Sequence, residues 1–502
     1  MKSSWMPIVV PTLLAVFGAA ALVLWLSSGL WTAATKPPDD GRGAPWLVSL
    51  GNHGRPPLAL REPGADGTPE PAQADTTRAT AAGLPIRGPG RPAEISGVWP
   101  AFRGPNRDAI LDDGTPLARV WPSQGPPVLW RIELGQGYAS PVIRDGRVYL
   151  LDYDEQARAD TMLCLSLADG REIWRNSYPV EVTPNHGCSR TVPALVHECV
   201  VSIGPRCHVA CWDAETGQNR WLIDMVQRFG AEERQWYTGQ CPLVDGDRVI
   251  LAPGGPETLL VAVEYRTGQV LWKTPNPRGW KMTHSSIMST EFAGQKMYVY
   301  CGTGGTAGIA ADDGRLLWDE TKWVENFATS PSPLPLPDGR IFLSSGYDMT
   351  GAMMLQIKQA GDKFDVDQAY TLKRKEFNSE HQTPIYYRGH LYGVRKLREQ
   401  MLCLDLDGKE VWNSGNLKFG HGPYMIADGM IFGLADNGLL ATMEATHEGY
   451  RPLAQFQVFE NGHDAWGPLA MVAGRLIVRD MTRMACVDVR AEPQPMTNDQ
   501  SN

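Results

Sequence analysis

The sequence has 502 residues, 43% of them hydrophobic, so it is long enough to bury one large core or several small ones. Its 52 glycines and 39 prolines indicate a globular chain with many turns. The formal net charge of -9, without any basic run, argues against a nucleic-acid-binding protein, because neutralising phosphates requires a basic face.

The N-terminal segment predicts a membrane anchor. Residues 3–35 contain no charged side chain, and the apolar run Met6–Leu26 is long enough to cross roughly 30 Å of hydrocarbon. The alternative is a cleaved signal peptide, whose apolar part is usually about 7 to 15 residues long. The flanking basic residues leave the orientation open. We expect residues 1–31 to form a short cytoplasmic stub and a transmembrane signal anchor.

Two further segments lack the pattern of a packed core. Residues 32–95 are rich in Pro, Gly, Ala, Arg and Asp, with no apolar periodicity, which is typical of a disordered linker. Residues 491–502 are polar and predict a short disordered tail. The folded domain is therefore expected over residues 96–490.

A hairpin phrase recurs through this domain. Each copy pairs two short apolar runs across a turn that usually contains glycine, which accepts the positive φ of tight turns. The eight copies begin at Ala139, Thr191, Gln240, Ser285, Ser330, Gln382, His421 and Trp466.

A second phrase follows the pattern strand, turn, strand and ends on a tryptophan. The stretch CWDAETGQNRW, Cys211–Trp221, is one copy, with its glycine four residues before the tryptophan. The glycine and tryptophan pairs are Gly170 and Trp174, Gly217 and Trp221, Gly268 and Trp272, Gly314 and Trp318, and Gly408 and Trp412. Because the spacing fixes each ring relative to its turn, we expect these tryptophans, with Trp130, to dock between neighbouring sheets.

Cysteines recur at one place in this second phrase. Cys164, Cys211, Cys403 and Cys486 stand where another copy has Ala262, so they predict small buried residues on an inner or middle strand.

The two phrases together give four strands per repeat of about 47 residues, the step from Trp174 to Trp221. The strand around Trp130 has no repeat of its own, and the final repeat lacks its outer strand. We expect the strand around Trp130 to supply the missing outer strand of the final repeat, which closes the ring and removes free sheet edges. The predicted fold class is all-β, an eight-bladed β-propeller of four-stranded blades, with an N-terminal transmembrane helix.

The repeat resembles the PQQ-type (pyrroloquinoline quinone) propeller repeat, AxDxxTGxxxW. The matching residues are Ala262, Glu264, Thr267, Gly268 and Trp272 in one copy and Asp213, Thr216, Gly217 and Trp221 in another. With the opening WPAFRGPNRD, Trp99–Asp108, the resemblance covers residues 96–490 and extends to BamB-like propeller proteins. It implies a bacterial protein of the exported, periplasmic side, in a family that mixes enzymes with binding scaffolds.

The resemblance also raises the question of a cofactor. Quinoprotein dehydrogenases with such repeats typically carry an adjacent cysteine pair and a calcium site, but none of the nine cysteines here is adjacent to another. No calcium or zinc ligand pattern is recognisable. We therefore expect no cofactor, with PQQ and calcium disfavoured, and no metal. Cys199 and Cys207 flank a hairpin turn, and the sequence leaves open whether they form a disulfide.

The residues just before each innermost strand are expected to surround the channel of the propeller. They are Tyr138, Arg190, Gln240, His381, His421 and Trp466, with Tyr237 and His284 nearby. These side chains offer the donors and flat faces of a site for a polar ligand or peptide. The alternative is that they fill the channel and bond one another or the loop backbone.

Two functions remain open. The first is a non-catalytic binding or scaffold module, tethered to the cytoplasmic membrane by a single span, that holds a protein or a small polar ligand at its channel face. The second is a PQQ-dependent oxidoreductase. The sequence favours the first, and it identifies no catalytic residue.

Overall fold

The computed structural model describes residues 81–324, 327–347 and 351–492, which all belong to one compact unit, Ala74–Asn502. The apolar run Met6–Leu26 and most of the predicted linker and tail lie outside the described residues. No helix within the described ranges is long and apolar enough to cross a membrane.

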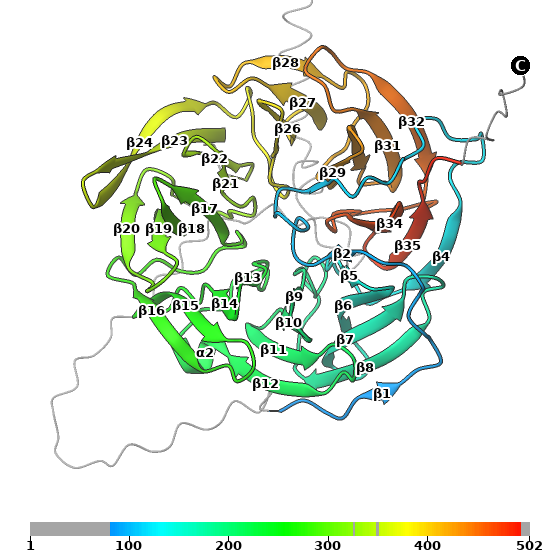
Figure 1. Ribbon diagram of the computed structural model, residues 1–502, viewed down its shortest axis with the longest axis horizontal. Helices are drawn as coiled ribbons and strands as arrows, with labels where there is room; N and C mark the ends of the chain where they lie inside the picture. The colour runs from blue at the N-terminus through cyan, green and yellow to red at the C-terminus, as the bar shows by residue number, and fades with distance from the viewer. Residues whose placement is uncertain (1–80, 325–326, 348–350, 493–502) are drawn as a thin grey trace, which may run out of the picture. The chain divides into compact units, whose positions relative to one another are not determined.

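Eight β-sheets surround a common axis and form the blades of a propeller (Figure 1). The strands of each blade are given from the axis outward. Blade 1 consists of β5 (Val142–Arg144), β6 (Arg147–Asp154), β7 (Ala159–Ser166) and β8 (Glu172–Pro179), and blade 2 of β9 (Ala194–Val196), β10 (Cys199–Ile203), β11 (His208–Asp213) and β12 (Asn219–Asp224). Blade 3 consists of β13 (Leu243–Asp245), β14 (Arg248–Leu251), β15 (Thr258–Glu264) and β16 (Val270–Pro275), and blade 4 of β17 (Met288–Phe292), β18 (Gln295–Gly302), β19 (Gly305–Ala310) and β20 (Leu316–Glu320).

Blade 5 consists of β21 (Leu334–Pro335), β22 (Arg340–Ser345), β23 (Gly351–Ala360) and β24 (Lys363–Leu372), and blade 6 of β25 (Ile385–Tyr387), β26 (His390–Arg395), β27 (Gln400–Leu404) and β28 (Glu410–Asn413). Blade 7 consists of β29 (Tyr424–Ala427), β30 (Met430–Leu434), β31 (Leu439–Glu444) and β32 (Pro452–Gln457), and blade 8 of β33 (Ala470–Val472), β34 (Arg475–Arg479), β35 (Arg483–Asp488) and β4 (Val128–Glu133). One short helix, α2 (Met225–Phe229), follows β12. The predicted eight-bladed propeller is confirmed.

The glycine-containing turns form as expected. In blade 1, Asp145 and Gly146 connect β5 to β6 with φ of 47° and 72°. A two-residue hairpin loop of type I′ requires positive φ at both positions, and glycine meets this requirement without steric cost. The local sequence therefore sets the end of the inner hairpin.

The last blade is closed by a strand from the start of the domain. β4 pairs antiparallel with β35, and Trp130 lies opposite Cys486. Figure 1 shows the cyan β4 beside the red β35. The predicted closure is confirmed: β4 covers the outer side of β35 and becomes the outer strand of blade 8.

Three short strands before β4 extend two of the blades beyond the expected four strands. β1 (Ile86–Arg87) pairs with β8, and β2 (Val98–Trp99) pairs with β5. β3 (Ile110–Leu111) pairs with β29 in blade 7. Residues 81–95 thus differ from the expected disordered linker, because β1 and backbone hydrogen bonds such as Gly90 N to Glu172 O fasten them to blade 1.

The segment between β2 and β3, which holds the opening motif, crosses from blade 1 to blade 7. Leu195 N of blade 2 donates to Pro100 O, and Arg103 Nη1 donates to Thr383 O before blade 6. The pairings of β2 and β3 lie next to the inner hairpin turns of blades 1 and 7. The motif therefore covers the end of the channel at which the inner hairpins turn.

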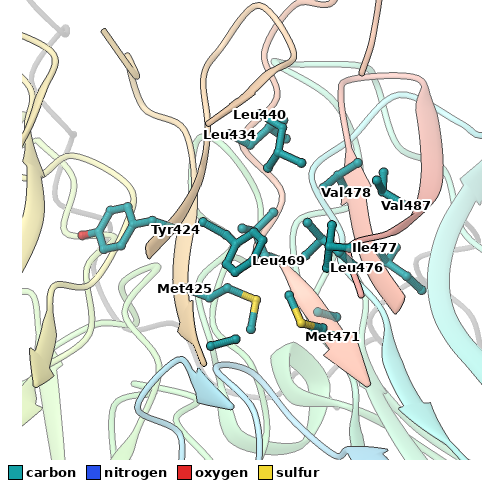
Figure 2. Packing of buried hydrophobic residues seen from close by; sticks show 14 of the residues in the cluster. Tyr424, Met425, Leu434, Leu440, Leu469, Met471, Leu476, Ile477, Val478 and Val487 are labelled. Atoms are coloured by element: carbon teal, nitrogen blue, oxygen red, sulfur yellow. The ribbon is translucent and has the colours of Figure 1, made fainter. Parts of the chain in front are cut away.

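Neighbouring blades pack through apolar side chains on their facing surfaces. Figure 2 shows this packing between blades 7 and 8, where buried side chains of the two blades meet. The labelled residues are Tyr424, Met425, Leu434, Leu440, Leu469, Met471, Leu476, Ile477, Val478 and Val487. Burial of such side chains is the main favourable term in folding.

The repeated tryptophans lie opposite small residues, which explains the recurrent cysteines. The register pairs are Cys164 and Trp174, Cys211 and Trp221, Ala262 and Trp272, Gly308 and Trp318, Cys403 and Trp412, and Cys486 and Trp130. The four cysteines are fully buried on the third strand of their blades, as predicted.

Several of these tryptophans contact the next blade. The rings of Trp130, Trp174 and Trp221 lie over the turn glycines of the following blades, at Gly170, Gly217 and Gly268. Their indole nitrogens donate to backbone oxygens of those blades, at Leu167 (2.9 Å), Ala214 (3.1 Å) and Tyr265 (2.8 Å). Each turn thus receives the tryptophan of the blade before it.

The other positions vary around the ring. Trp412 donates to Thr446 O in the next blade at 2.7 Å, whereas Trp318 donates to Met297 Sδ of its own blade at 3.4 Å. Trp272 lies over Gly314, but its indole nitrogen has no partner in the described part of the chain, because Arg248 occupies Ala311 O. The hydrogen bond to the next blade is therefore not common to all six.

All nine cysteines are buried free thiols. Cys199 begins β10 opposite Asp213, while Cys207 lies beyond the other end of that strand, with Sγ 3.1 Å from Thr238 Oγ1. The hairpin register separates Cys199 from Cys207, so the structure has no disulfide between them.

Candidate functional site at the channel mouth

The candidate residues lie where the chain enters the innermost strands. Tyr138 precedes β5, Arg190 precedes β9, His381 precedes β25, His421 precedes β29 and Trp466 precedes β33. This is the end of the inner strands away from their hairpin turns. We call it the channel mouth.

Seven residues form a closed circuit of contacts at the mouth, which we call the mouth ring. Its members are Tyr138, Arg190, Trp236, Phe327, Tyr347, His381 and Trp466. Their contacts run through five pairs of aromatic or imidazole rings, with centroids 4.7 to 5.7 Å apart. Arg190 completes the circuit, since its guanidinium lies 5.5 Å from the centre of the Tyr138 ring and its Nε donates to Trp236 O at 2.5 Å.

His421 lies against this ring. Its imidazole stacks on His381 with centroids 4.3 Å apart and lies 4.8 Å from Trp466. Five predicted residues therefore come together, although they are separated by up to 328 positions, from Tyr138 to Trp466.

Two predicted residues are structural. Gln240 is fully buried, and its amide donates to Ala252 O (2.8 Å) and accepts from Ala252 N (3.2 Å), so both of its polar ends are used within blade 3. The Tyr237 hydroxyl donates to Thr183 O (2.7 Å) and accepts from Thr183 N (3.1 Å). Both side chains therefore hold backbone, and neither is among the contacts that close the mouth ring.

His284 lies beside the mouth ring, with its imidazole 6.4 Å from the Trp236 ring. Only 9% of its surface is exposed, and burial, together with the charge of Arg190, lowers its pKa to about 3. His381 is also neutral at physiological pH, because burial and the charge of His421 hold its pKa well below the ordinary value. Its Nε2 bonds the Tyr347 hydroxyl.

Three members of the mouth ring escaped the sequence analysis. Trp236 lies six residues before Pro242, whereas the predicted residues lie two or three residues before the proline that precedes each inner strand. Phe327 lies four residues before Pro331, in a stretch with several prolines that does not show which one precedes the strand. Tyr347 follows β22 and has no signal in the repeat.

The other side of the mouth holds a compensated charge cluster. His421 Nε2 bonds Glu380 Oε2, and His421 Nδ1 lies 3.0 Å from Lys396 Nζ and 3.5 Å from Asp436 Oδ2. Asp436 Oδ1 also accepts from the indole nitrogen of Trp466 at 2.9 Å. Two carboxylates thus lie around His421, and the hydrogen bond to Asp436 fixes the position of the Trp466 indole.

Burial lowers the pKa of His421, but its hydrogen bonds to Asp436 and Glu380 outweigh burial, and the net pKa is raised. A raised folded-state pKa gives stability that is fully present below the unfolded value of about 6.5 and is lost as pH rises through the folded value. We expect His421→Gln to lower the unfolding free energy by about 1.5 kcal/mol at pH 5.5 and by clearly less at pH 8.5. Urea unfolding at the two pH values measures this, and a loss that grows with pH would contradict it.

No group of three His, Cys, Asp or Glu side chains that could hold a metal ion occurs in the described ranges. The mouth instead offers flat ring faces, a guanidinium and hydroxyl and imidazole groups. Groups of these kinds can donate hydrogen bonds to a polar ligand and stack on its flat faces.

Comparisons with known proteins agree with this architecture. A family model described as outer membrane protein assembly factor BamB matches residues 159–414. No curated protein matches the sequence. The crystal structure of BamB from Moraxella catarrhalis is 12% identical, with a TM-score of 0.50 over 72% of this chain and 99% of that chain.

Two further solved structures have lower TM-scores. A quinohemoprotein alcohol dehydrogenase from Pseudomonas putida HK5 is 11% identical, with a TM-score of 0.41 over 80% of this chain and 82% of that chain. A computationally designed protein is 11% identical, with a TM-score of 0.49 over 72% of this chain and 100% of that chain.

Proposed function

Because this chain belongs to the PQQ-like propeller family described as outer membrane protein assembly factor BamB, we propose that it is a non-catalytic binding or scaffold module. It holds a protein or a small polar ligand at its channel mouth. The observation that carries this proposal is the mouth ring, a circuit of contacting flat side chains contributed by six of the eight blades or the loops before them.

The exposure of the mouth ring supports ligand binding rather than a role limited to filling the channel. Phe327 contacts both Trp236 and Tyr347, yet 52% of its surface is exposed. Aromatic side chains are enriched at the energetic centres of protein interfaces, where they fill a partner's pocket with little loss of side-chain entropy. The opposite end of the channel is covered by the segment between β2 and β3, so a ligand approaches from the mouth.

The residues do not fit a quinone and calcium site of the dehydrogenase kind. The sequence has no adjacent cysteine pair, and the described residues contain no candidate metal cluster. Function without PQQ or calcium is therefore part of the proposal, and no reaction step is assigned to these groups.

The proposal also places the propeller on the exported side of the cytoplasmic membrane. The uncharged run within residues 1–31 acts as a single transmembrane anchor, and the Pro- and Gly-rich residues after it act as a tether. A tethered binding domain searches a limited volume near the membrane, which raises its effective concentration for partners there.

Photocrosslinking tests the binding site. We expect a benzoylphenylalanine residue placed at Phe327 to form a crosslinked product in cells, detected by intact mass, because this position faces the ligand. The matched control carries the same residue at Leu271, which is 51% exposed on the outer strand of blade 3.

Tyr138→Ala should reduce the Phe327 product several-fold, since Tyr138 supports the ring through Trp466 and Arg190. Equal products at both positions, or a Phe327 product unchanged by Tyr138→Ala, would contradict binding at the mouth.

A further inference from the structure

Arg190 carries a positive charge that no carboxylate in the described residues neutralises through an ion pair. Its guanidinium donates to the backbone oxygens of Trp236 (2.5 Å), Asn185 (2.5 Å) and His186 (2.8 Å). These carbonyls hold the side chain in place but supply no net negative charge. Burial lowers the pKa of Arg190, so its environment favours a counter-charge.

Two neighbouring hydroxyls are buried and lack hydrogen-bond partners in the described ranges. They belong to Tyr138 and Ser189. The exposed fractions of these residues are 8% and 1%, whereas the nearby imidazole of His284 bonds the backbone of Trp236 and Tyr237. Buried polar groups are nearly always hydrogen-bonded in native proteins, so such a cluster indicates a missing partner.

These groups belong to one sector of the mouth. Tyr138 N and Ala139 N both donate to Ser189 O, at 2.7 and 3.1 Å, which places Tyr138 beside Ser189 and Arg190. Arg190 in turn binds Trp236 O, and the Trp236 ring lies next to His284. The charge of Arg190 acts on His284, since after burial it is the next cause of the low pKa of that imidazole.

The side chains of this sector are mainly hydrogen-bond donors. Arginine only donates, and each hydroxyl supplies one hydrogen. The geometry points to an anion subsite in which Arg190, Tyr138 and Ser189 bind a carboxylate or phosphate group of the ligand, beside the imidazole of His284. This inference rests on the proposed function and specifies its ligand as negatively charged and rich in acceptors.

The rest of the mouth does not compete for this role. Lys396, the cation beside His421, lies 3.7 Å from Glu399, and His421 itself bonds Glu380, so these charges are compensated. Asp464 also acts on Tyr138, but this carboxylate is about one-third exposed and lies 3.6 Å from His463, where solvent screens it. Arg190 therefore marks the sector with an uncompensated positive charge.

Acetate and acetamide test the subsite, because they share a shape and differ in charge. Titration of residues 81–502 is followed by NMR of the histidine side chains and by thermal unfolding. We expect acetate to shift the His284 signals in a saturable way and to raise the melting temperature, and acetamide to do neither. Inorganic phosphate in a parallel titration shows which anion class binds more tightly.

Tyr138→Phe removes a hydroxyl that bonds nothing else in the described residues. We expect this variant to raise the Kd for acetate about tenfold while the melting temperature stays the same or rises, because a buried unpartnered group is lost. Ser189→Ala should behave alike. The matched control, Tyr153→Phe, removes a buried hydroxyl that binds Val180 O (3.1 Å) and Val182 N (3.0 Å), so it should lower the melting temperature and leave the Kd unchanged.

Equal responses to acetate and acetamide, or an unchanged Kd in both Tyr138→Phe and Ser189→Ala, would overturn the subsite and assign these hydroxyls to buried water. The Phe327 crosslink separates the two proposals. A ring-dependent crosslink without an acetate response would leave binding at the mouth in place and refute only the anion subsite.

Discussion

Removing residues 1–135 will abolish the soluble fold, whereas removing residues 1–80 will leave a folded monomer. The longer deletion takes away β4, which pairs with β35 from Glu133 to Val128, and with it Trp130, whose ring covers Gly170 of blade 1. The last blade then has three strands and an exposed edge, which pairs readily with other chains. The shorter deletion keeps β1, β2, β3 and β4.

Size-exclusion chromatography and circular dichroism of the two truncated proteins measure this difference. Co-expression of residues 81–135 as a separate chain is the control, since it should restore solubility to residues 136–502 by supplying β4. A stable monomer from residues 136–502 alone would refute closure by β4. The same experiment tests the proposed anchor, because the full chain should sediment with membranes and residues 81–502 should not.

Trp174→Ala will cost about 3 to 5 kcal/mol of unfolding free energy. The ring is fully buried, lies over Gly217 of the next blade and donates to Ala214 O at 3.1 Å. Two packed sheets cannot collapse into the space that an indole leaves, so the cavity persists, and Ala214 O loses a donor. Trp221→Ala should behave similarly, because it makes the same contacts one blade further on.

Trp272→Ala should cost less than these two, because its indole nitrogen makes no hydrogen bond among the described residues and the ring is only partly buried. Leu271→Ala, at an exposed neighbouring position, is the control and should change stability by about 0.5 kcal/mol or less. Urea unfolding of the truncated domain provides the values. Equal losses for Trp174→Ala and Leu271→Ala would mean that the tryptophan does not hold the blades together.

The blades could be predicted from the sequence because their signals are local. A glycine with positive φ and a tryptophan four residues later belong to one turn, and the cysteine opposite the tryptophan is small because the indole occupies its space. The closing strand followed from counting strands. Because these features repeat along the chain, each copy supports the assignment of the strands in the others.

The mouth could be predicted only in part because loops do not follow the repeat. Tyr138, Arg190, His381, His421 and Trp466 come together because each directly precedes an inner strand. Gln240 holds an equivalent position, yet its amide turns to Ala252 within its own blade. Whether such a side chain faces the channel depends on χ angles and loop lengths, which spacing does not encode.

The crossing segment before β3 escaped prediction for a similar reason. Its strands, β2 and β3, are two residues long and pair with blades 1 and 7, so they have no alternation to detect. The motif WPAFRGPNRD marks this segment in the sequence, but only the structure gives it a role, the covering of one end of the channel.

Closure by β4 also has a consequence for how the molecule is made. Glu133 pairs with Arg483, 350 positions later. Strand β4 can therefore pair only after the last blade has formed. Pairings over such sequence separations form slowly, since the entropy of closing the loop is lost before the contacts form. A chain that stops before β35 has blades but no completed ring, and its unpaired β4 remains available to proteases and to chaperones. The N-terminal strand β4 is therefore stably paired only when the C-terminal strand β35 is present and folded.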